Sequence, residues 1–171
     1  MALTPAGAQS AAADLADLTD CPADAVLALN NAHQVETSLL DRESYNRLVD
    51  AAGFAVAVGR TPDAFLIAFN DASVHDNDNL AWFRHRHERF YYVDRVIVAP
   101  AARGRGLARV LYGALMDRAR AEGRFLIGCE INVEPPNPGS DALHAGLGFA
   151  EIGRRELQHR KIIRYMRLSL A

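Results

Sequence analysis

The chain has 171 residues, a length that suits one domain with a single hydrophobic core. Half of its residues are hydrophobic, 23% are charged and the formal net charge is −2, so the composition gives no reason to expect a nucleic-acid partner. No run of about 18 apolar residues occurs, and we therefore expect no segment that spans a membrane.

The first 13 residues are small and mostly apolar, but they lack the basic start and Leu-rich centre of a secretion signal. We expect residues 1–13 to be a frayed tail and residues 14–171 to form one domain. The two cysteines, Cys21 and Cys129, are not spaced as metal ligands or as a disulfide framework. Ordinary thiols of this kind are typical of a reducing compartment, so the chain is predicted to be cytoplasmic.

Two helices are predicted in the first half, over residues 20–34 and 41–52, because apolar side chains recur there at helical spacing. A β-hairpin follows, with strands at 54–58 and 64–69 joined by the turn-forming run Gly-Arg-Thr-Pro-Asp. Residues 75–89 are polar and are predicted to form a long loop with room for a short helix. Its aromatic residues would be tucked against the domain, or would form a wall on one side of a binding site.

The second half has a clearer pattern. A strand dense in aromatic and β-branched residues is predicted at 90–98, a helix at 104–122 and a second strand at 125–133. A strand, a helix and a strand in this order form a βαβ-like unit.

A short helix and two strands complete the prediction. Ser140 is expected to cap a helix at 141–147, and strands are expected at 149–157 and 162–170. The predicted fold class is α/β or α+β, with one mixed sheet.

The most informative stretch covers residues 96–108, where a strand leads into a glycine-rich turn and then a helix. Backbone N–H groups at a helix start lack intrahelical partners, and the helix dipole makes their surroundings positive. Gly104 and Gly106 carry no Cβ that would keep a phosphate away from these donors. Arg103 and Arg105 add positive charge. The pattern predicts a loop that binds pyrophosphate.

Three phosphate ligands compete for this loop. A nucleoside-triphosphate loop needs Gly-x-x-x-x-Gly-Lys-Ser/Thr, which the chain lacks. A dinucleotide loop needs Gly-x-Gly-x-x-Gly close behind the strand, but Arg109 stands in the third glycine position and five residues separate Val98 from Gly104. The third ligand is coenzyme A.

The run Val98-Ala-Pro, followed by Arg103-Gly-Arg-Gly106 at a helix start, resembles the phosphate loop of the GNAT superfamily of N-acetyltransferases. A second similarity is Asn137, about a dozen residues before the pair Gly148-Phe149, with a short helix between them. The matching part covers residues 91–170, nearly half of the chain. The resemblance implies a mixed, mostly antiparallel sheet flanked by helices, with acetyl-CoA as co-substrate.

The resemblance also implies cofactor contacts for the matching residues. The main chain of Val96, Ile97 and Val98 would pair with the pantetheine arm like an added strand. The side chain of Asn137 would form a hydrogen bond with pantetheine. The implied pyrophosphate donors are the backbone N–H groups of six consecutive residues, Arg103, Gly104, Arg105, Gly106, Leu107 and Ala108.

Two positions depart from the family's pattern. Ala101 replaces the Arg or Gln that opens the phosphate loop, a loss that the backbone donors make tolerable. His144 stands one turn before Gly148-Phe149, where the family commonly has a Tyr that faces the thiol leaving group. A free thiol has a pKa of about 8.5, and a His with a pKa of about 6.5 can give a proton to the departing thiolate. His144 is the predicted general acid, and a half-exposed place beside the core is the structural alternative.

Two carboxylates are candidates for the general base that takes a proton from the amine. Asp94 is expected on the same face of its strand as Tyr92, Val96 and Val98, because side chains two residues apart point the same way. The structural explanation, which we prefer, is an ion pair with a neighbouring Arg or a cap for a nearby loop. Glu130 shares a face with Asn132, and burial would raise its pKa toward a useful value, although the same structural explanation applies.

Together these observations predict an N-acetyltransferase that moves an acetyl group from acetyl-CoA to a primary amine of a small molecule or peptide, by direct attack in a ternary complex. The rival from another class is a non-catalytic CoA-binding sensor or interaction module, and a dinucleotide-dependent oxidoreductase is a weaker rival. No nucleic-acid or membrane partner is predicted, and a homodimer is compatible with the resemblance. No metal is predicted, since His75, Asp76 and Asp78 lack rigid ligand spacing.

Overall fold

The computed structural model describes residues 14–33 and 37–171, so the expected tail at 1–13 lies outside the described residues. A seven-stranded sheet runs in the order β1-β2-β3-β4-β5-β7-β6. Neighbouring strands are antiparallel except for β4 and β5, which are parallel. The predicted mixed, mostly antiparallel sheet is confirmed.

The elements agree with the prediction except in a few places. The strands are β1 (Leu15–Asp17), β2 (Phe54–Val58), β3 (Ala64–Asn70), β4 (Phe90–Val98), β5 (Leu126–Glu134), β6 (Ala150–Glu156) and β7 (Ile162–Ser169). The helices are α1 (Ala23–Asn31), α2 (Arg42–Ala51), α3 (Asp78–Arg84), α4 (Leu107–Ala121) and α5 (Pro138–Leu147). Strand β1 was not predicted, because three residues are too few to show a period of two. Helix α3 is the short helix allowed within the expected loop.

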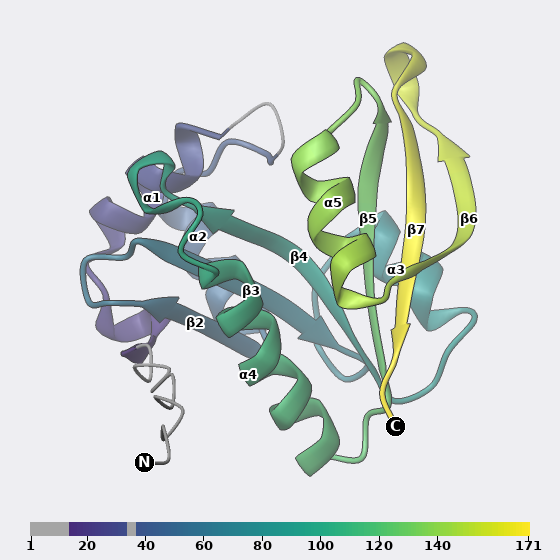
Figure 1. Cartoon of the computed structure of the whole chain (residues 1–171), viewed down its shortest axis with the longest axis horizontal. Coiled ribbons are helices and arrows are strands. Elements are labelled where there is room, and N and C mark those ends of the chain that lie inside the picture. The colour runs from purple at the N-terminus through teal and green to yellow at the C-terminus, as the bar shows by residue number, and fades with distance from the viewer. Residues whose placement is uncertain (1–13, 34–36) are drawn as a thin grey trace, which may run out of the picture.

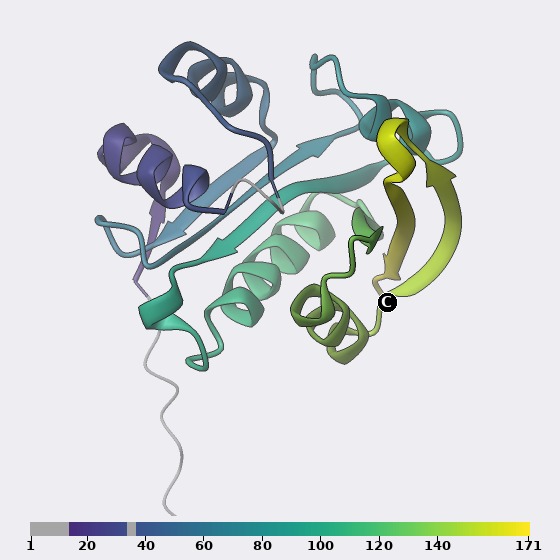
Figure 2. The same cartoon turned by 90° about the horizontal axis from the view of Figure 1, so that it is seen from above.

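Helices cover both faces of the sheet, which Figure 2 shows from above. On one face, Leu111 of α4 and Leu147 of α5 pack in one cluster with Cys129 of β5. On the other face, α1, α2 and α3 contribute Val26, Leu48, Phe83 and other buried residues. Trp82 stacks on Tyr165, with ring centroids 4.0 Å apart. The predicted packing of the aromatic residues of α3 against the domain is thereby confirmed.

Strand β4 contains an irregularity that the sequence pattern did not reveal. Ile67 of β3 pairs with Arg95 and the next residue pairs with Val93, so Asp94 is an extra, bulged residue. A bulge shifts the alternation of faces by one residue. Val96 packs with the α4 side of the sheet, whereas Ile97 packs with the α1 side. The prediction that Asp94 shares a face with Val96 and Val98 was therefore wrong.

The parallel strands β4 and β5 pair over a short distance and then separate. Phe90, Tyr91 and Tyr92 pair with Leu126, Ile127 and Gly128, and no further pairs follow. Figure 1 shows the two strands side by side near one end and apart at the other, with α5 beside the opening. Past Tyr92, β4 pairs on its other edge with β3. The edge that faces β5 is therefore open to a further hydrogen-bonding partner.

Helix α5 begins earlier than predicted, at Pro138. Its N-cap is Asn137, whose Oδ1 accepts a hydrogen bond of 3.1 Å from the backbone N–H of Ser140. Ser140 is thus inside the first turn, and the prediction that it caps the helix was wrong. Pro at the first helical position explains the earlier start, because its fixed φ suits a helix and it has no N–H to satisfy.

Candidate active site

The glycine-rich turn before α4 has the backbone conformation that the sequence indicated. Gly104 and Gly106 have φ angles of +76° and +75°, which L-residues with a side chain rarely adopt. A Cβ built on either glycine would meet no atom within 4 Å, so the space in front of the turn is open. No side chain among the described residues caps α4 at its N-cap, Gly106. The first N–H groups of α4 are therefore available to an anion.

The two arginines of this turn point to different places. Arg105 forms an exposed ion pair of 2.9 Å with Asp63, in the connection between β2 and β3. Arg103 lies instead 3.2 Å from Nε2 of His33, at the end of α1. Nδ1 of His33 lies 2.9 Å from the carbonyl oxygen of Leu29, which makes it the protonated nitrogen and leaves Nε2 to accept from Arg103.

A groove of about 540 Å³ lies between the end of β4 and the start of α5, beside the opening between β4 and β5, and we call it the interstrand groove. The predicted residues Val96, Ile97, Val98, Arg103, Ala108 and Asn137 line it. Gly104, Arg105, Gly106 and Leu107 lie beyond its lining, and the ion pair of Arg105 directs its guanidinium to Asp63. The groove thus runs from the turn before α4 along the open edge of β4.

A smaller cavity of about 130 Å³, the inner pocket, adjoins this groove. The two cavities have Thr37, Val96, Asn137 and Ser140 in common. The inner pocket brings together all three predicted catalytic residues, Asp94, Glu130 and His144. They come from β4, β5 and α5, so the separation of the strands is what gathers them. Asn132 also lines it, which confirms that Asn132 shares a face with Glu130.

Glu130 is partly buried where β5 leaves β4. Burial raises its pKa to about 7, and the nearby charge of Asp94 adds to the rise. The hydroxyl of Tyr92 donates a hydrogen bond of 2.5 Å to Oε2 of Glu130, which opposes part of that rise. The carboxyl group is therefore divided between its charged and neutral forms near neutral pH, as a general base requires.

Asp94 is held in a structural ion pair. Its Oδ2 lies 2.7 Å from Nε of Arg95, and the two side chains are only 7% and 6% exposed. Its Oδ1 accepts a hydrogen bond of 3.2 Å from Asn77. Arg95 donates further to Oδ1 of Asn30 and to Oγ of Ser38. The explanation by a neighbouring Arg is confirmed, since the bulge turns both side chains toward the same face.

His144 is deeply buried, with 3% of its surface exposed, so the half-exposed alternative was wrong. Its Nε2 lies 2.7 Å from the hydroxyl of Tyr112, and its Nδ1 lies 2.7 Å from the carbonyl oxygen of Ser140. Burial lowers the pKa of His144 below its usual value. Sequence reasoning missed Tyr112, because a Tyr on the apolar face of a helix looks like ordinary core.

The inner pocket also contains a thiol, that of Cys129. This residue is 3% exposed, and burial raises the pKa of its thiol well above the usual value. A neutral thiol is a weak nucleophile. Cys129 therefore lines the pocket without acting as a nucleophile.

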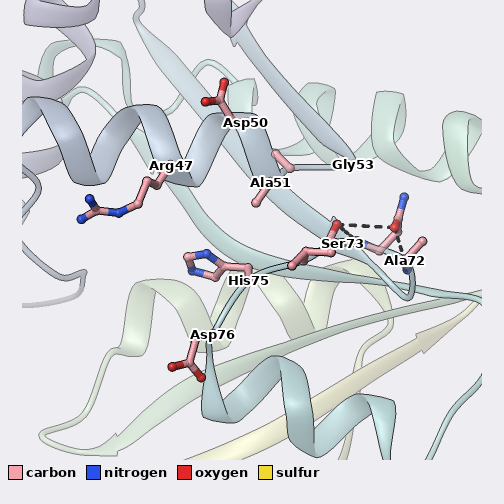
Figure 3. Close-up of a pocket in the computed structure, with 11 residues that line it drawn as sticks. Arg47, Asp50, Ala51, Gly53, Ala72, Ser73, His75 and Asp76 are labelled. Atoms are coloured by element: carbon pink, nitrogen blue, oxygen red, sulfur yellow. Dashed lines mark hydrogen bonds between the residues drawn. The ribbon is translucent and has the colours of Figure 1, made fainter.

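A larger cavity, of about 810 Å³, lies elsewhere, between the end of α2 and the segment after β3. It contains none of the predicted site residues. Figure 3 shows that the side chains of Arg47, Asp50 and Asp76 point in different directions and do not converge. Within residues 14–33 and 37–171, no three His, Cys, Asp or Glu side chains gather as metal ligands, and no helix could cross a membrane.

Two curated proteins resemble parts of this chain. A phosphinothricin N-acetyltransferase of Streptomyces coelicolor is 40% identical over 70 residues, which are 41% of this chain and 40% of that protein. A mycothiol acetyltransferase of Renibacterium salmoninarum is 33% identical over 123 residues, which are 71% of this chain and 33% of that protein. The similarity thus spans well under half of each relative.

Solved structures share the fold at low identity. The ribosomal-protein-S18-alanine N-acetyltransferase of Escherichia coli has a TM-score of 0.63 and 18% identity, covering 92% of this chain and 93% of that one. The protein yncA of Salmonella typhimurium, solved with acetyl-CoA, has a TM-score of 0.65 and 21% identity, covering 92% of each chain. The model of the family described as "Acetyltransferase (GNAT) family" matches residues 27–149 of this chain. The chain therefore belongs to the GNAT acetyltransferase family.

Proposed function

We propose that the protein is an N-acetyltransferase that moves an acetyl group from acetyl-CoA to a primary amine of a small molecule or peptide. The observation that carries the proposal is the continuity of two cavities. The interstrand groove begins at an uncapped helix start and meets a pocket that contains a carboxyl group with a pKa of about 7. A phosphate-bearing thioester laid along the groove would bring its reactive end to that carboxyl group.

The groove offers the contacts that coenzyme A needs. The N–H groups of residues 103–108, with the Arg103 guanidinium, would hold the pyrophosphate. The open edge of β4 at Val96–Val98 would pair with the pantetheine amides as a further strand does. Asn137 uses Oδ1 to cap α5, and its amide nitrogen, for which no acceptor lies among the described residues, would donate to pantetheine. Acetyl-CoA, when bound, supplies the acetyl group as a thioester.

Glu130 is the general base in this proposal, and Asp94 supports the site without taking the proton. A base must be free to gain a proton near neutral pH, and the pKa of Glu130 meets that condition. Asp94 already accepts from Arg95 and Asn77, so protonating it would break a buried ion pair. We place the source of the leaving-group proton at His144 and its hydrogen-bonded partner.

The buried thiol favours direct attack over an acetylated enzyme. A two-step transfer through Cys129 would need its thiolate, and the raised pKa of that thiol opposes its formation. Direct attack needs amine and thioester in the site together, and the adjoining cavities provide two places. The proposal is therefore a ternary complex.

Thermal unfolding with and without acetyl-CoA, followed by a thiol-release assay with a panel of amines, tests the proposal. At about 100 times its dissociation constant, a ligand adds roughly 2.7 kcal/mol to the stability of the folded state. NAD and ATP serve as controls and are expected to leave the unfolding temperature unchanged. Stabilisation by acetyl-CoA without thiol release from any amine would favour the non-catalytic CoA-binding module. Absence of stabilisation by acetyl-CoA would overturn the proposal.

A further inference from the structure

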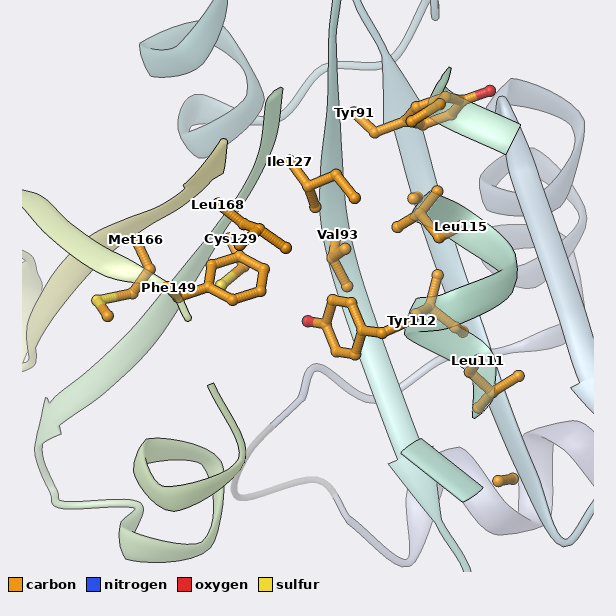
Figure 4. Close-up of a cluster of buried hydrophobic side chains, with 14 of the residues drawn as sticks. Tyr91, Val93, Leu111, Tyr112, Leu115, Ile127, Cys129, Phe149, Met166 and Leu168 are labelled. Atoms are coloured by element: carbon orange, nitrogen blue, oxygen red, sulfur yellow. The ribbon is translucent and has the colours of Figure 1, made fainter. Parts of the chain in front are cut away.

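Tyr112 and His144 form a buried pair between α4 and α5. Both side chains are almost inaccessible, at 0% and 3% exposure, and their rings meet edge to face with centroids 5.5 Å apart. Figure 4 shows the hydroxyl of Tyr112 pointing away from α4, across the core and toward β5 and Cys129. Both residues line the inner pocket. The pair therefore lies at the end of the groove where the thioester sulfur would sit.

The hydrogen bonds of His144 fix the direction in which it can give a proton. Nδ1 lies 2.7 Å from the carbonyl oxygen of Ser140, and a carbonyl oxygen only accepts, so Nδ1 carries a hydrogen. Nε2 then accepts from Tyr112 when the ring is neutral and donates to Tyr112 when the ring is protonated. Nδ1 also lies 3.1 Å from Oγ of Ser140, so both neighbours of Nδ1 belong to one residue. The hydroxyl of Tyr112 is the partner of Nε2 and is the route by which the Nε2 proton of His144 can leave the pair.

We propose that the hydroxyl of Tyr112 gives the proton to the departing sulfur, and that His144 is a positioning residue that returns a proton to Tyr112. This inference rests on the proposed acetyltransferase function. It moves the catalytic contact from the residue in the family's Tyr position to a Tyr on another helix. The position of His144 in the sequence indicated the right end of the pocket but the wrong contacting group.

The step balances in protons and electrons. As the carbon–sulfur bond breaks, its electron pair stays on sulfur, which takes the hydroxyl proton of Tyr112. The oxygen of Tyr112 takes the Nε2 proton of the His144 imidazolium, the form that burial of His144 makes less populated at neutral pH, while the Nδ1 proton stays on Nδ1 and keeps its hydrogen bond to the Ser140 carbonyl. The products are a thiol, a neutral Tyr and a neutral His, and His144 regains its proton from solvent water between turnovers. Nothing is oxidised or reduced.

The test is a double-mutant cycle on the turnover of the full-length protein. We would measure thiol release for the wild type, Tyr112→Phe, His144→Ala and the double variant. Proton transfer by a side chain typically contributes about 10²–10⁴-fold, so Tyr112→Phe is expected to lower kcat about 10²-fold while the KM for acetyl-CoA changes less than about twofold. Because the two residues act as one unit, the double variant should be no slower than the slower single variant.

Tyr91→Phe is the matched control. Tyr91 is equally buried in the same cluster, but its hydroxyl bonds to Glu122 and to the Gly53 carbonyl, far along the sheet from His144. Its kcat is expected to equal that of the wild type. A Tyr112→Phe variant with kcat within about twofold of the wild type, or losses that multiply in the double variant, would overturn the inference while leaving the acetyltransferase function intact.

A second substitution covers the case in which Tyr112→Phe does not fold. Site-specific incorporation of 3-fluorotyrosine at position 112 keeps the shape and makes the phenol a stronger acid. A faster single-turnover rate would support proton donation by this hydroxyl, and an unchanged rate would overturn it. If the wild-type protein binds acetyl-CoA but does not release thiol with any of the amines tested, the proposed function itself is overturned, and the inference with it.

Discussion

Tyr92 of β4 belongs to the last residue pair that joins β4 to β5, and its hydroxyl donates a hydrogen bond of 2.5 Å to Oε2 of Glu130, two residues past that pair on β5. The bond connects the strands where the backbone no longer does. It also fixes the carboxyl group at the wall of the inner pocket, so a strand rather than a loop positions the proposed base.

The pH dependence of activity follows from Glu130. The base form is the deprotonated one, and its pKa is raised to about 7, so kcat/KM is expected to increase as the pH rises through about 7. Glu130→Gln should lose about 10²-fold in kcat/KM and the dependence around this pH. Glu134→Gln, at the exposed end of the same strand, is the control. A Glu130→Gln variant with the wild-type pH profile would assign the base elsewhere.

The same residue gives a prediction for stability. The pKa of Glu130 is higher in the folded state than its usual value of 4.5, so the folded state binds this proton more tightly than the unfolded state. The contribution of protonated Glu130 to the free energy of unfolding is therefore fully present below about pH 4.5 and is lost as the pH rises through about 7. Thermal unfolding at pH 4 and at pH 8 measures the difference in stability between Glu130→Gln and the wild type. This difference should favour the variant more at pH 8 than at pH 4. Parallel pH curves for the two proteins would contradict this.

The turn before α4 can be tested by adding a charge to it. Gly104→Glu places a carboxylate in the open space where a phosphate would bind, so stabilisation by acetyl-CoA should be abolished. Gly59→Glu is the matched control, because Gly59 has the same left-handed φ, at +78°, but lies in the turn after β2. Both variants carry similar backbone strain. Equal responses of the two variants to acetyl-CoA would disprove the placement of the pyrophosphate.

The buried ion pair on β4 predicts a large effect on stability. Arg95→Met leaves Asp94 charged and unpaired at 7% exposure, and such losses cost about 3–5 kcal/mol. Arg105→Met breaks an exposed pair with Asp63 and should cost about 0–1 kcal/mol. Urea unfolding of the two variants measures the difference. Similar costs would mean that Arg95 is not held as the structure shows.

The buried thiol predicts a negative result. Cys129→Ala is expected to keep kcat within about fivefold of the wild type, because a neutral thiol takes no part in a direct transfer whose acid–base groups supply about 10²-fold each. Mass spectrometry of the protein mixed with acetyl-CoA alone should reveal no acetyl group on Cys129. An acetylated cysteine that is consumed when an amine is added would establish a two-step transfer.

Much of the fold was predictable because strands such as β3 are short apolar runs next to turn residues, and helices such as α4 have the helical period. The failures have local causes. The bulge at Asp94 is invisible to a pattern of period two, since one extra residue inverts the faces that follow it. The contact of Tyr112 with His144 depends on how α4 and α5 approach each other. Sequence spacing therefore located Glu130 and His144 but could not identify the hydroxyl between helices.

The short pairing of β4 with β5 also has a consequence for hydrogen exchange. Three residue pairs join the two halves of the sheet, so the amides on the open edge of β4 have no strand to protect them. A ligand that adds itself to this edge would protect amides within Val96–Val98 and leave the β3-facing amides of the same strand as slow as before. The exchange rate along one strand would thus report, residue by residue, which of its two edges the ligand occupies.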